Sequence, residues 1–315
     1  MFEALESLGI FKLRLATRVL SRRQGLAMGR ALGRIAWRLG LRRAVSLDNV
    51  RRALGDQLDA TQREATVLGA YEHLGMTVVE LLQLPRMSRS ARRASVEFVG
   101  REHLDAALAA GRGAIVASAH YGNWEFLGAG GVAYDLPVTF VVQRLRNARI
   151  DAMLRGMRES LGIRVVERGM ALRRLRDEIA ANRLVAVMCD QDARRRGIFV
   201  PFFATPASTH KGAAQLAMRL DTPFIPLFGR RLADGRHRMV VRDPIQAPKH
   251  MREEDAIDAM MSRFNQMLEE EICIDPRQYL WMHRRWKTVP APEVCVADDF
   301  GVGPVQPPGV DRSRP

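Results

Sequence analysis

A histidine and a glutamate lie five residues apart, just after a short apolar stretch of the chain. Residues 114–118 are apolar with β-branched side chains at their centre, which predicts a buried strand, and His120 follows that strand. On one regular helix, neighbouring side chains are three or four residues apart, so His120 and Glu125 would point to different faces. Gly122 and Asn123 permit a turn between them. With that turn, Glu125 can accept a hydrogen bond from one imidazole nitrogen and leave the other as a proton acceptor.

The same two residues also fit a purely structural interpretation, in which the histidine caps a helix and the glutamate lies on its solvated face. The wider motif favours chemistry. The sequence HYGNWE at residues 120–125 resembles the His-(four residues)-Asp/Glu motif of glycerolipid-type acyltransferases, and in particular the bacterial lipid A late acyltransferases. The resemblance covers roughly residues 40–288 and implies the α/β fold of that superfamily.

Further polar residues follow two other predicted strands. Arg144 comes after an apolar run at 136–142, and Asp190 and Asp192 come after another at 184–189. In an open α/β sheet, ligands bind outside the carboxyl ends of the strands, so these side chains are candidate substrate contacts. Arg144 also resembles the arginine of the family's second motif, although a surface position explains it as well. Two carboxylates are too few to predict a metal site, and we expect neither metal nor cofactor.

The stretch from residue 190 to residue 209 carries a run of arginines and several aromatic residues. A charge run alone is usually a solvated surface. The whole stretch nevertheless resembles the substrate groove of the lipid A acyltransferases, which makes Arg194 and Arg195 further candidate substrate contacts. Its aromatic residues fit either the wall of an acyl channel or an ordinary packed core.

The resemblance implies acyl transfer from an acyl-thioester donor, either acyl carrier protein or acyl-CoA, to a hydroxyl of a phosphorylated glycolipid such as a lipid A precursor. In this hypothesis His120 removes the proton from the acceptor hydroxyl, and Glu125 orients the imidazole and stabilises its charged form. The oxygen then attacks the thioester directly, which agrees with the absence of a Gly-x-Ser-x-Gly elbow from the sequence. Another glycolipid, such as a phosphatidylinositol mannoside, is the alternative acceptor.

The composition indicates an acidic partner. The 315 residues include 49 Lys and Arg against 35 Asp and Glu, which gives a formal net charge of +14. An anionic membrane surface, a phosphorylated substrate or an acidic carrier protein would each suit this charge. A nucleic-acid-binding protein is the competing class, but only 6% of residues are aromatic, so few side chains could stack on bases, and we expect no nucleic acid partner. Three widely spaced cysteines predict neither a disulfide framework nor a zinc site.

Strands alternate with helices through the middle of the chain, which predicts an α/β fold with a central mixed sheet flanked by helices. We assign residues 46–289 to this glycerolipid acyltransferase-like domain. Residues 290–315 are rich in Pro and Gly and lack helical or strand periodicity, which predicts a disordered tail.

The N-terminal segment, residues 1–45, is predicted to be helical, amphipathic and basic. Apolar residues recur at helical spacing through 2–43, with arginines interspersed among them. Basic amphipathic helices often lie flat in a membrane interface, although a helix packed on a core gives the same pattern. The charges interrupt the segment too often for a spanning helix. We therefore expect peripheral attachment to the cytoplasmic face of the inner membrane.

Overall fold

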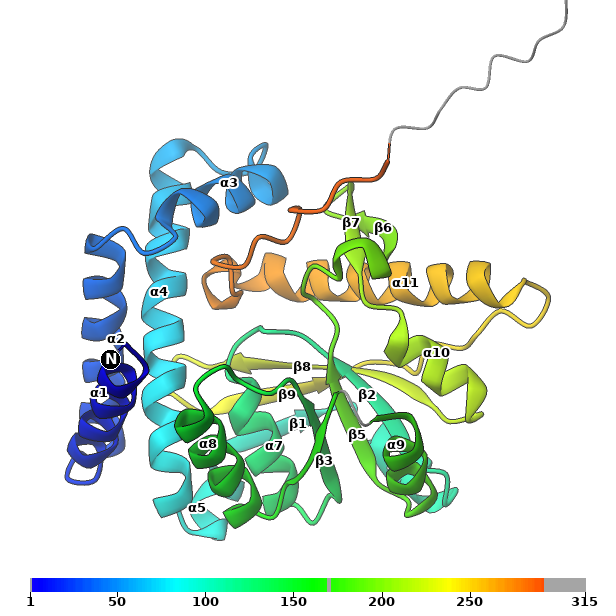
Figure 1. Cartoon of the computed structure of the whole chain (residues 1–315), viewed down its shortest axis with the longest axis horizontal. Helices are drawn as coiled ribbons and strands as arrows, with labels where there is room; N and C mark the ends of the chain where they lie inside the picture. Colours follow the sequence, from blue (N-terminus) through cyan, green and yellow to red (C-terminus); the bar gives the residue numbers. More distant parts are fainter. Residues whose placement is uncertain (1, 169–170, 292–315) are drawn as a thin grey trace, which may run out of the picture.

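The computed structural model of the chain describes residues 2–168 and 171–291, so the predicted tail from residue 290 lies almost wholly outside the described residues. Its centre is a seven-stranded sheet with the strand order β1-β9-β8-β2-β5-β3-β4 (Figure 1). The strands of this sheet are β1 (Val96–Val99), β2 (Ala114–Ser118), β3 (Val138–Val142), β4 (Arg164–Glu167), β5 (Leu184–Met188), β8 (Phe224–Arg231) and β9 (His237–Val241). A separate two-stranded sheet consists of β6 (Ile198–Phe202) and β7 (Thr205–Thr209).

The sheet is mixed, as the sequence predicts. Strands β8, β2, β5, β3 and β4 run parallel to one another, whereas β9 is antiparallel to β8 and parallel to β1. The β8–β9 hairpin turns at Asp234 and Gly235, where Gly235 has a φ of 85°, a conformation that glycine adopts without strain. Because β2 and β5 are parallel neighbours in the centre, the residues that follow them meet at one edge of the sheet.

Helices pack on both faces of the sheet (Figure 1). The helices are α1 (Phe2–Thr17), α2 (Arg22–Arg38), α3 (Arg43–Leu54), α4 (Ala60–Gln83), α5 (Arg89–Ala94), α6 (Glu102–Ala109), α7 (Trp124–Ala133), α8 (Ala148–Ser160), α9 (Ala171–Ala180), α10 (Gly212–Arg219) and α11 (Glu253–Ile274). Buried side chains of β2 alternate between two apolar clusters: Ile115 and Ala117 join a cluster with α9, α10 and α11, and Ala114 and Val116 join one with α6 and α7. This alternation is the period of two that a strand buried on both faces requires.

Two segments form elements that the sequence pattern does not indicate. The stretch at 190–209 contains the antiparallel β6–β7 hairpin, in which Pro201 stands opposite Pro206. The two prolines conceal the hairpin in the sequence, because proline cannot donate to a strand ladder and argues against a strand. The basic segment after α4 is the other, and it contains a short 3-10 turn, Leu84–Arg86, and helix α5.

The N-terminal segment is helical, as predicted, and its second helix packs closely along α4. Gly25, Gly29 and Gly33 recur every fourth residue on α2 and are all buried. A Cβ atom added at Gly33 would lie 2.2 Å from the backbone oxygen of Tyr71, and one added at Gly29 would lie 2.6 Å from the Cα of Met76. The missing side chains therefore let the backbones of α2 and α4 approach each other directly.

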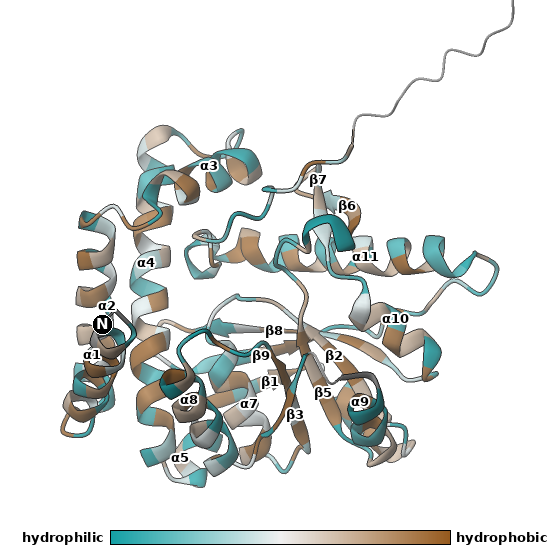
Figure 2. Cartoon of the chain, viewed as in Figure 1, coloured by the Kyte–Doolittle hydropathy of each residue, from teal (hydrophilic) through white to brown (hydrophobic). Residues whose placement is uncertain are grey.

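The outer surface of these helices keeps exposed apolar side chains. Leu8, Phe11 and Leu15 form a stripe along α1, and Leu32 and Ile35 continue the exposed apolar surface on α2. Figure 2 shows brown, apolar residues on α1 and α2, interrupted by teal, hydrophilic ones. No helix in the described part of the chain is both long enough and apolar enough to cross a bilayer.

The close contact of α2 with α4 predicts opposite effects for two glycine-to-alanine changes. Gly33→Ala should lower the thermal unfolding temperature, because its methyl group collides with the backbone of Tyr71, and overpacking costs roughly 1–3 kcal/mol. Gly9→Ala on α1 is the matched control, since nothing lies within 4 Å of an added Cβ there. It should be neutral or stabilising by up to about 1 kcal/mol. Equal unfolding temperatures for the two variants would contradict this packing.

Candidate active site

The imidazole of His120 is bound by Asp190, not by the glutamate that follows it in the sequence. His120 Nδ1 lies 2.8 Å from Asp190 Oδ1, and the backbone N–H of His120 donates to Asp190 Oδ2 at 3.0 Å. One carboxylate thus holds both the ring and the backbone of the histidine. The Asp190 side chain is 3% exposed and the His120 side chain 17%, so the acid is buried and the base reaches the surface. Since Nδ1 binds the carboxylate, Nε2 is the nitrogen left for a substrate proton.

The charges of this pair favour a basic imidazole. Burial lowers the pKa of His120, but the charge of Asp190 and the hydrogen bond to it, together with the more distant charge of Glu125, raise it above its ordinary value. For Asp190 burial acts in the other direction and raises the pKa, but the charge of the neighbouring His120 and its hydrogen bonds lower the pKa of Asp190 below its usual range. Asp190 therefore stays ionised and stabilises the imidazolium that forms when His120 takes a proton.

The expected hydrogen bond from Glu125 to His120 is replaced by an ion pair with Arg158. The Glu125 carboxylate accepts from Arg158 Nε at 3.0 Å and from a terminal guanidinium nitrogen at 2.5 Å. Both side chains are largely buried, and the pair joins the first turn of α7 to the last turn of α8. Such bidentate geometry is the strongest that arginine offers a carboxylate. Glu125 consequently acts on His120 through its charge and by fixing α7.

The turn between the two residues forms as the sequence predicts. Gly122 has a φ of 62°, and an added Cβ would lie 1.9 Å from the backbone oxygen of Gly229. Asn123 then caps α7 by accepting from the N–H of Phe126 at 3.0 Å, while its amide donates to Glu80 at 2.7 Å. Because Glu80 lies on α4, this buried hydrogen bond links the turn to the helix against which α2 packs.

The C-terminal strap, residues 276–288, holds the same turn from the other side. The N–H of Leu280 donates to the backbone oxygen of His120 at 3.1 Å, and the N–H of Gly122 donates to the backbone oxygen of Gln278 at 2.9 Å. Asn49 on α3 holds the strap in turn, because its buried amide donates to the backbone oxygens of Trp281 at 2.7 Å and His283 at 2.6 Å. The strap therefore fixes the backbone of the candidate base.

The other predicted contact residues lie at or near the carboxyl edge with different surroundings. Asp192 accepts from the hydroxyl of Thr288 at 3.1 Å, and its N–H donates to His283 Nε2 at 2.9 Å, so it anchors the strap. Arg144 is exposed directly after β3. Arg194 and Arg195 are exposed in a 3-10 turn after β5. These arginines have no carboxylate within ion-pair distance among the described residues, which leaves their charges available to a ligand.

Two residues bear on the chemistry that the sequence alone did not reveal. Arg158 could have been suspected only as one of several basic residues on its helix, because the contact with Glu125 spans 33 positions of sequence. Cys189 lies beside Asp190 but is fully buried, and burial raises the pKa of its thiol to about 12. It is therefore an unsuitable nucleophile.

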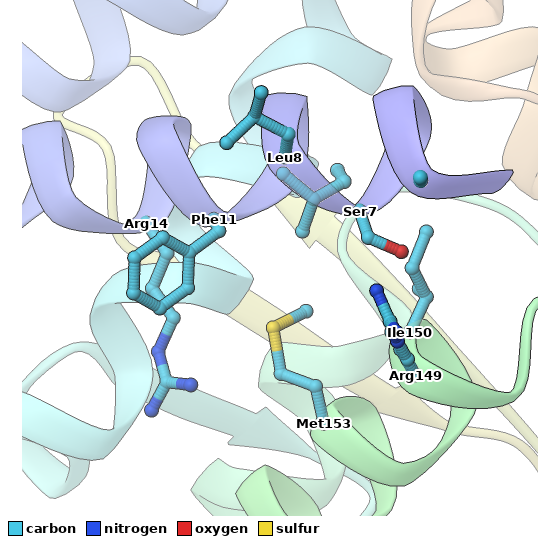
Figure 3. A pocket seen from close by; sticks show the side chains of 9 residues that line it. Ser7, Leu8, Phe11, Arg14, Arg149, Ile150 and Met153 are labelled. Carbon is cyan, nitrogen blue, oxygen red and sulfur yellow. The ribbon is translucent and has the colours of Figure 1, made fainter. Parts of the chain in front are cut away.

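A hollow lies between α1 and α8, and His120 is not among the residues that line it. It is a groove of about 560 Å³, lined mostly by apolar side chains of Leu8, Phe11, Ile150 and Met153 (Figure 3). Arg14 and Arg149 also line it. The groove connects the exposed stripe of α1 with the helix that holds Glu125 through Arg158.

The buried ion pair of Glu125 and Arg158 predicts a large stability effect. Arg158→Met should lower the free energy of unfolding by roughly 3–5 kcal/mol, because it leaves a buried carboxylate without its partner. Adding Glu125→Gln to that variant should recover part of the loss. Arg155→Met is the matched control on the same helix. Its partner is Glu167 at 2.6 Å, and both side chains are more than a quarter exposed, so its loss should cost about 1 kcal/mol or less. Denaturant unfolding measures all three, and an equal loss for Arg155→Met and Arg158→Met would contradict the assignment.

Comparison with known proteins identifies the family of the chain. The profile of the family described as bacterial lipid A biosynthesis acyltransferase matches residues 2–288. The chain is 27% identical over 267 residues to a lipid A biosynthesis lauroyltransferase of Escherichia coli K12, covering 84% of this chain and 85% of that protein. It is 33% identical over 184 residues to a phosphatidylinositol mannoside acyltransferase of Mycobacterium tuberculosis, covering 56% of this chain and 58% of that protein. The chain thus spans little more than half the length of that mycobacterial relative.

The family profile covers the sheet, the His120 turn and the C-terminal strap alike. The chain belongs to the bacterial lipid A biosynthesis acyltransferase family.

Proposed function

We propose that the protein transfers a fatty acyl chain from an acyl-thioester donor to a hydroxyl of a phosphorylated glycolipid, with His120 as the general base. The observation that carries the proposal is the partly exposed imidazole bound through Nδ1 to the buried, ionised Asp190. Nε2 takes the proton of the acceptor hydroxyl as its oxygen attacks the thioester carbonyl. The carbonyl then re-forms, the thiolate leaves, and the imidazolium returns its proton to the thiolate.

Asp190 acts in this proposal as the positioning residue of the base. It holds the ring in the tautomer that bares Nε2, and its charge stabilises the imidazolium intermediate. Sequence reasoning assigned these tasks to Glu125 and treated Asp190 as a substrate contact. Glu125 keeps a smaller electrostatic effect on His120 and a structural link to Arg158.

The acceptor is proposed to be a lipid A precursor, because the lipid A lauroyltransferase matches most of both chains. A phosphatidylinositol mannoside is the second candidate, favoured by the higher identity over the shorter match. Both acceptors are phosphorylated glycolipids, so the exposed arginines at the carboxyl edge suit either one. We propose acyl carrier protein or acyl-CoA as the donor, since both carry the acyl chain as a thioester and both are acidic.

We further propose that the protein attaches peripherally to the cytoplasmic face of the inner membrane through α1 and α2. The exposed apolar stripe of α1 would enter the acyl boundary, while Arg14 and Arg149 beside it would meet anionic headgroups. The tie between α1 and α8 supports this placement, since Asn147, which caps α8, donates to the backbone oxygen of Glu3 at 2.9 Å. Membrane contact at α1 would thus lie next to the loop that carries Arg144.

The catalytic proposal predicts how activity depends on His120, Asp190 and pH. His120→Ala should lower kcat/KM by about 100- to 10,000-fold, since the acceptor hydroxyl loses its base. In the wild type, kcat/KM should rise with pH as His120 loses its proton, with a midpoint above the ordinary histidine pKa of about 6.5, because Asp190 raises that pKa. Asp190→Asn should lower the rate and move this midpoint to lower pH. The assay follows acyl transfer from an acyl carrier protein thioester to each candidate acceptor.

The control for this assay is Asp105→Asn, which changes an exposed carboxylate on α6 that pairs with Arg101. It should leave both rate and midpoint unchanged. A folded His120→Ala protein with near-normal activity would refute the role of the base. An Asp190→Asn profile with the wild-type midpoint would show that Asp190 is only structural.

The membrane proposal predicts that apolar side chains of α1 contribute to binding of anionic vesicles. The triple change Leu8→Ser, Phe11→Ser and Leu15→Ser should weaken vesicle binding by about tenfold or more, because burying one such side chain contributes roughly 1.5–3 kcal/mol. Raising the salt concentration should weaken the remaining attraction. Val99→Ser with Ile274→Ser is the control, since both residues are more than half exposed elsewhere on the protein. Vesicle flotation measures binding, and unchanged binding of the triple variant would exclude α1 as the attachment site.

A further inference from the structure

Arg168 and His210 form an unusual contact between two basic side chains. A terminal guanidinium nitrogen of Arg168 lies 3.0 Å from His210 Nδ1. Because arginine can only donate, Nδ1 is the acceptor and the imidazole is neutral, with its proton on Nε2. Burial, followed by the charges of Arg168 and Arg285, lowers the pKa of His210 to about 4, although Asp190 and Asp192 act in the opposite direction. The contact therefore presents donors from both side chains.

Both residues belong to the carboxyl edge of the sheet. Arg168 directly follows β4, and its N–H donates to the backbone oxygen of Val142 at the end of β3 at 2.9 Å. His210 directly follows β7, whose end is held by the buried Arg285. That guanidinium donates to the backbone oxygen of Ser208 and to the hydroxyl of Thr209, each at 2.6 Å. Because β4 and β2 run parallel within one sheet, this contact lies at the edge of the sheet that also carries His120.

The backbone adds further donors next to His210. Helix α10 begins at Gly212 after Lys211, and no side chain caps its first turn. The first N–H groups of a helix lack intrahelical partners and favour an anion. An added Cβ at Gly212 would meet nothing within 4 Å, so the space at this end of the helix is open.

Acidic side chains act on these donors only through their charge: Asp190 and Asp192 act on His210, and Asp258 responds to Lys211. In the described part of the chain neither Arg168 nor Lys211 has a carboxylate within ion-pair distance, whereas Arg164, at the start of β4, pairs with Glu178 at 3.1 Å. Arg168 is exposed, so its charge is accessible to a ligand. A guanidinium, an imidazole N–H, an ammonium and a helix start together match the oxygens of a phosphate.

We propose that Arg168, His210, Lys211 and the first turn of α10 bind a phosphate group of a substrate at the edge of the sheet that also carries His120. This inference rests on the proposed function, because it assigns a specific part of the substrate to a specific part of the site. Two proposed substrates carry such a group: the donor has a phosphopantetheine linker, and the acceptor has a phosphate on its glycolipid headgroup. The shared chemistry is a phosphate ester that reaches the carboxyl edge beyond β4.

The experiment compares phosphorylated and unphosphorylated substrates in the full-length protein. Acyl-phosphopantetheine is tested against acyl-pantetheine as the donor, and each acceptor is tested against its dephosphorylated form. For one of these pairs, the preference of the wild type for the phosphate should fall roughly 10- to 100-fold in Arg168→Met, the usual effect of losing a charged hydrogen bond. His210→Gln should produce a smaller loss of the same preference, because the amide keeps one donor. The pair that responds identifies the source of the phosphate.

Arg112→Met is the matched control, an exposed arginine that precedes β2 at the opposite edge of the sheet. It removes the same charge and should leave both preferences unchanged. Unaltered preferences in a folded Arg168→Met protein, or an equal decrease in Arg112→Met, would overturn the inference.

Direct binding of 4′-phosphopantetheine and of inorganic phosphate, followed by calorimetry, separates this inference from the proposed function. In one outcome, the wild type binds a probe but transfers no acyl group. If the Arg168→Met variant then bound that probe at least tenfold more weakly than the wild type, the phosphate site would stand and the acyltransfer proposal would fall. If acyl transfer required His120 while Arg168→Met changed neither probe binding nor the preference for phosphorylated substrates, the acyltransfer proposal would stand and the phosphate site would fall.

Discussion

The buried carboxylate of Asp190 is the constraint on which the rest of the site depends. It accepts hydrogen bonds from both the ring and the backbone of His120, so the base has one orientation relative to the sheet. An unpaired charge at this depth would be costly, and the histidine supplies the compensation. The pairing is possible because β2 and β5 are parallel neighbours whose carboxyl ends meet. The hydrogen bonds between Asp190 and His120 therefore link the ends of β2 and β5 and also orient the imidazole.

The surrounding elements hold the backbone of the His120 turn from several sides. The C-terminal strap binds it through Leu280 and Gln278, and Asn123 ties it to Glu80 on α4. Burial would raise the pKa of Glu80, but the charge of Arg231, whose guanidinium lies 2.6 Å away, lowers it and keeps the carboxylate ionised. The turn thus lies between two sets of hydrogen bonds, one to the C-terminal strap and the other to Glu80 on α4. A rigid base on a short turn is what proton transfer at a defined angle requires.

Local sequence patterns predicted what depends on local physics. The strand at 114–118 and the turn at Gly122 each follow from side chains within a few residues, and the structure contains both. The partner of His120 could not be predicted in this way, because Asp190 becomes its neighbour only through the strand order. Glu125 was the nearer carboxylate in sequence, but Arg158 binds it across 33 positions.

Some non-local features were nevertheless visible in the sequence. Glycines at every fourth position of α2 signal a close helix contact, although they do not reveal that the partner is α4. The contact between Arg168 and His210 leaves no comparable pattern, since 42 positions separate the two residues. The basic net charge indicates an acidic partner, and the structure exposes Arg144, Arg194 and Arg195 without a carboxylate at ion-pair distance among the described residues.

The protonation pattern of the His120 ring in the resting protein tests the central claim most directly. Nitrogen-15 chemical shifts, with His120→Gln used to assign the signals, distinguish the two neutral tautomers above the histidine pKa. The account predicts a proton on Nδ1, donated to Asp190, and an unprotonated Nε2 ready to accept the proton of a hydroxyl. A neutral ring with its proton on Nε2 would contradict it, because Asp190 could then not orient His120 as a base.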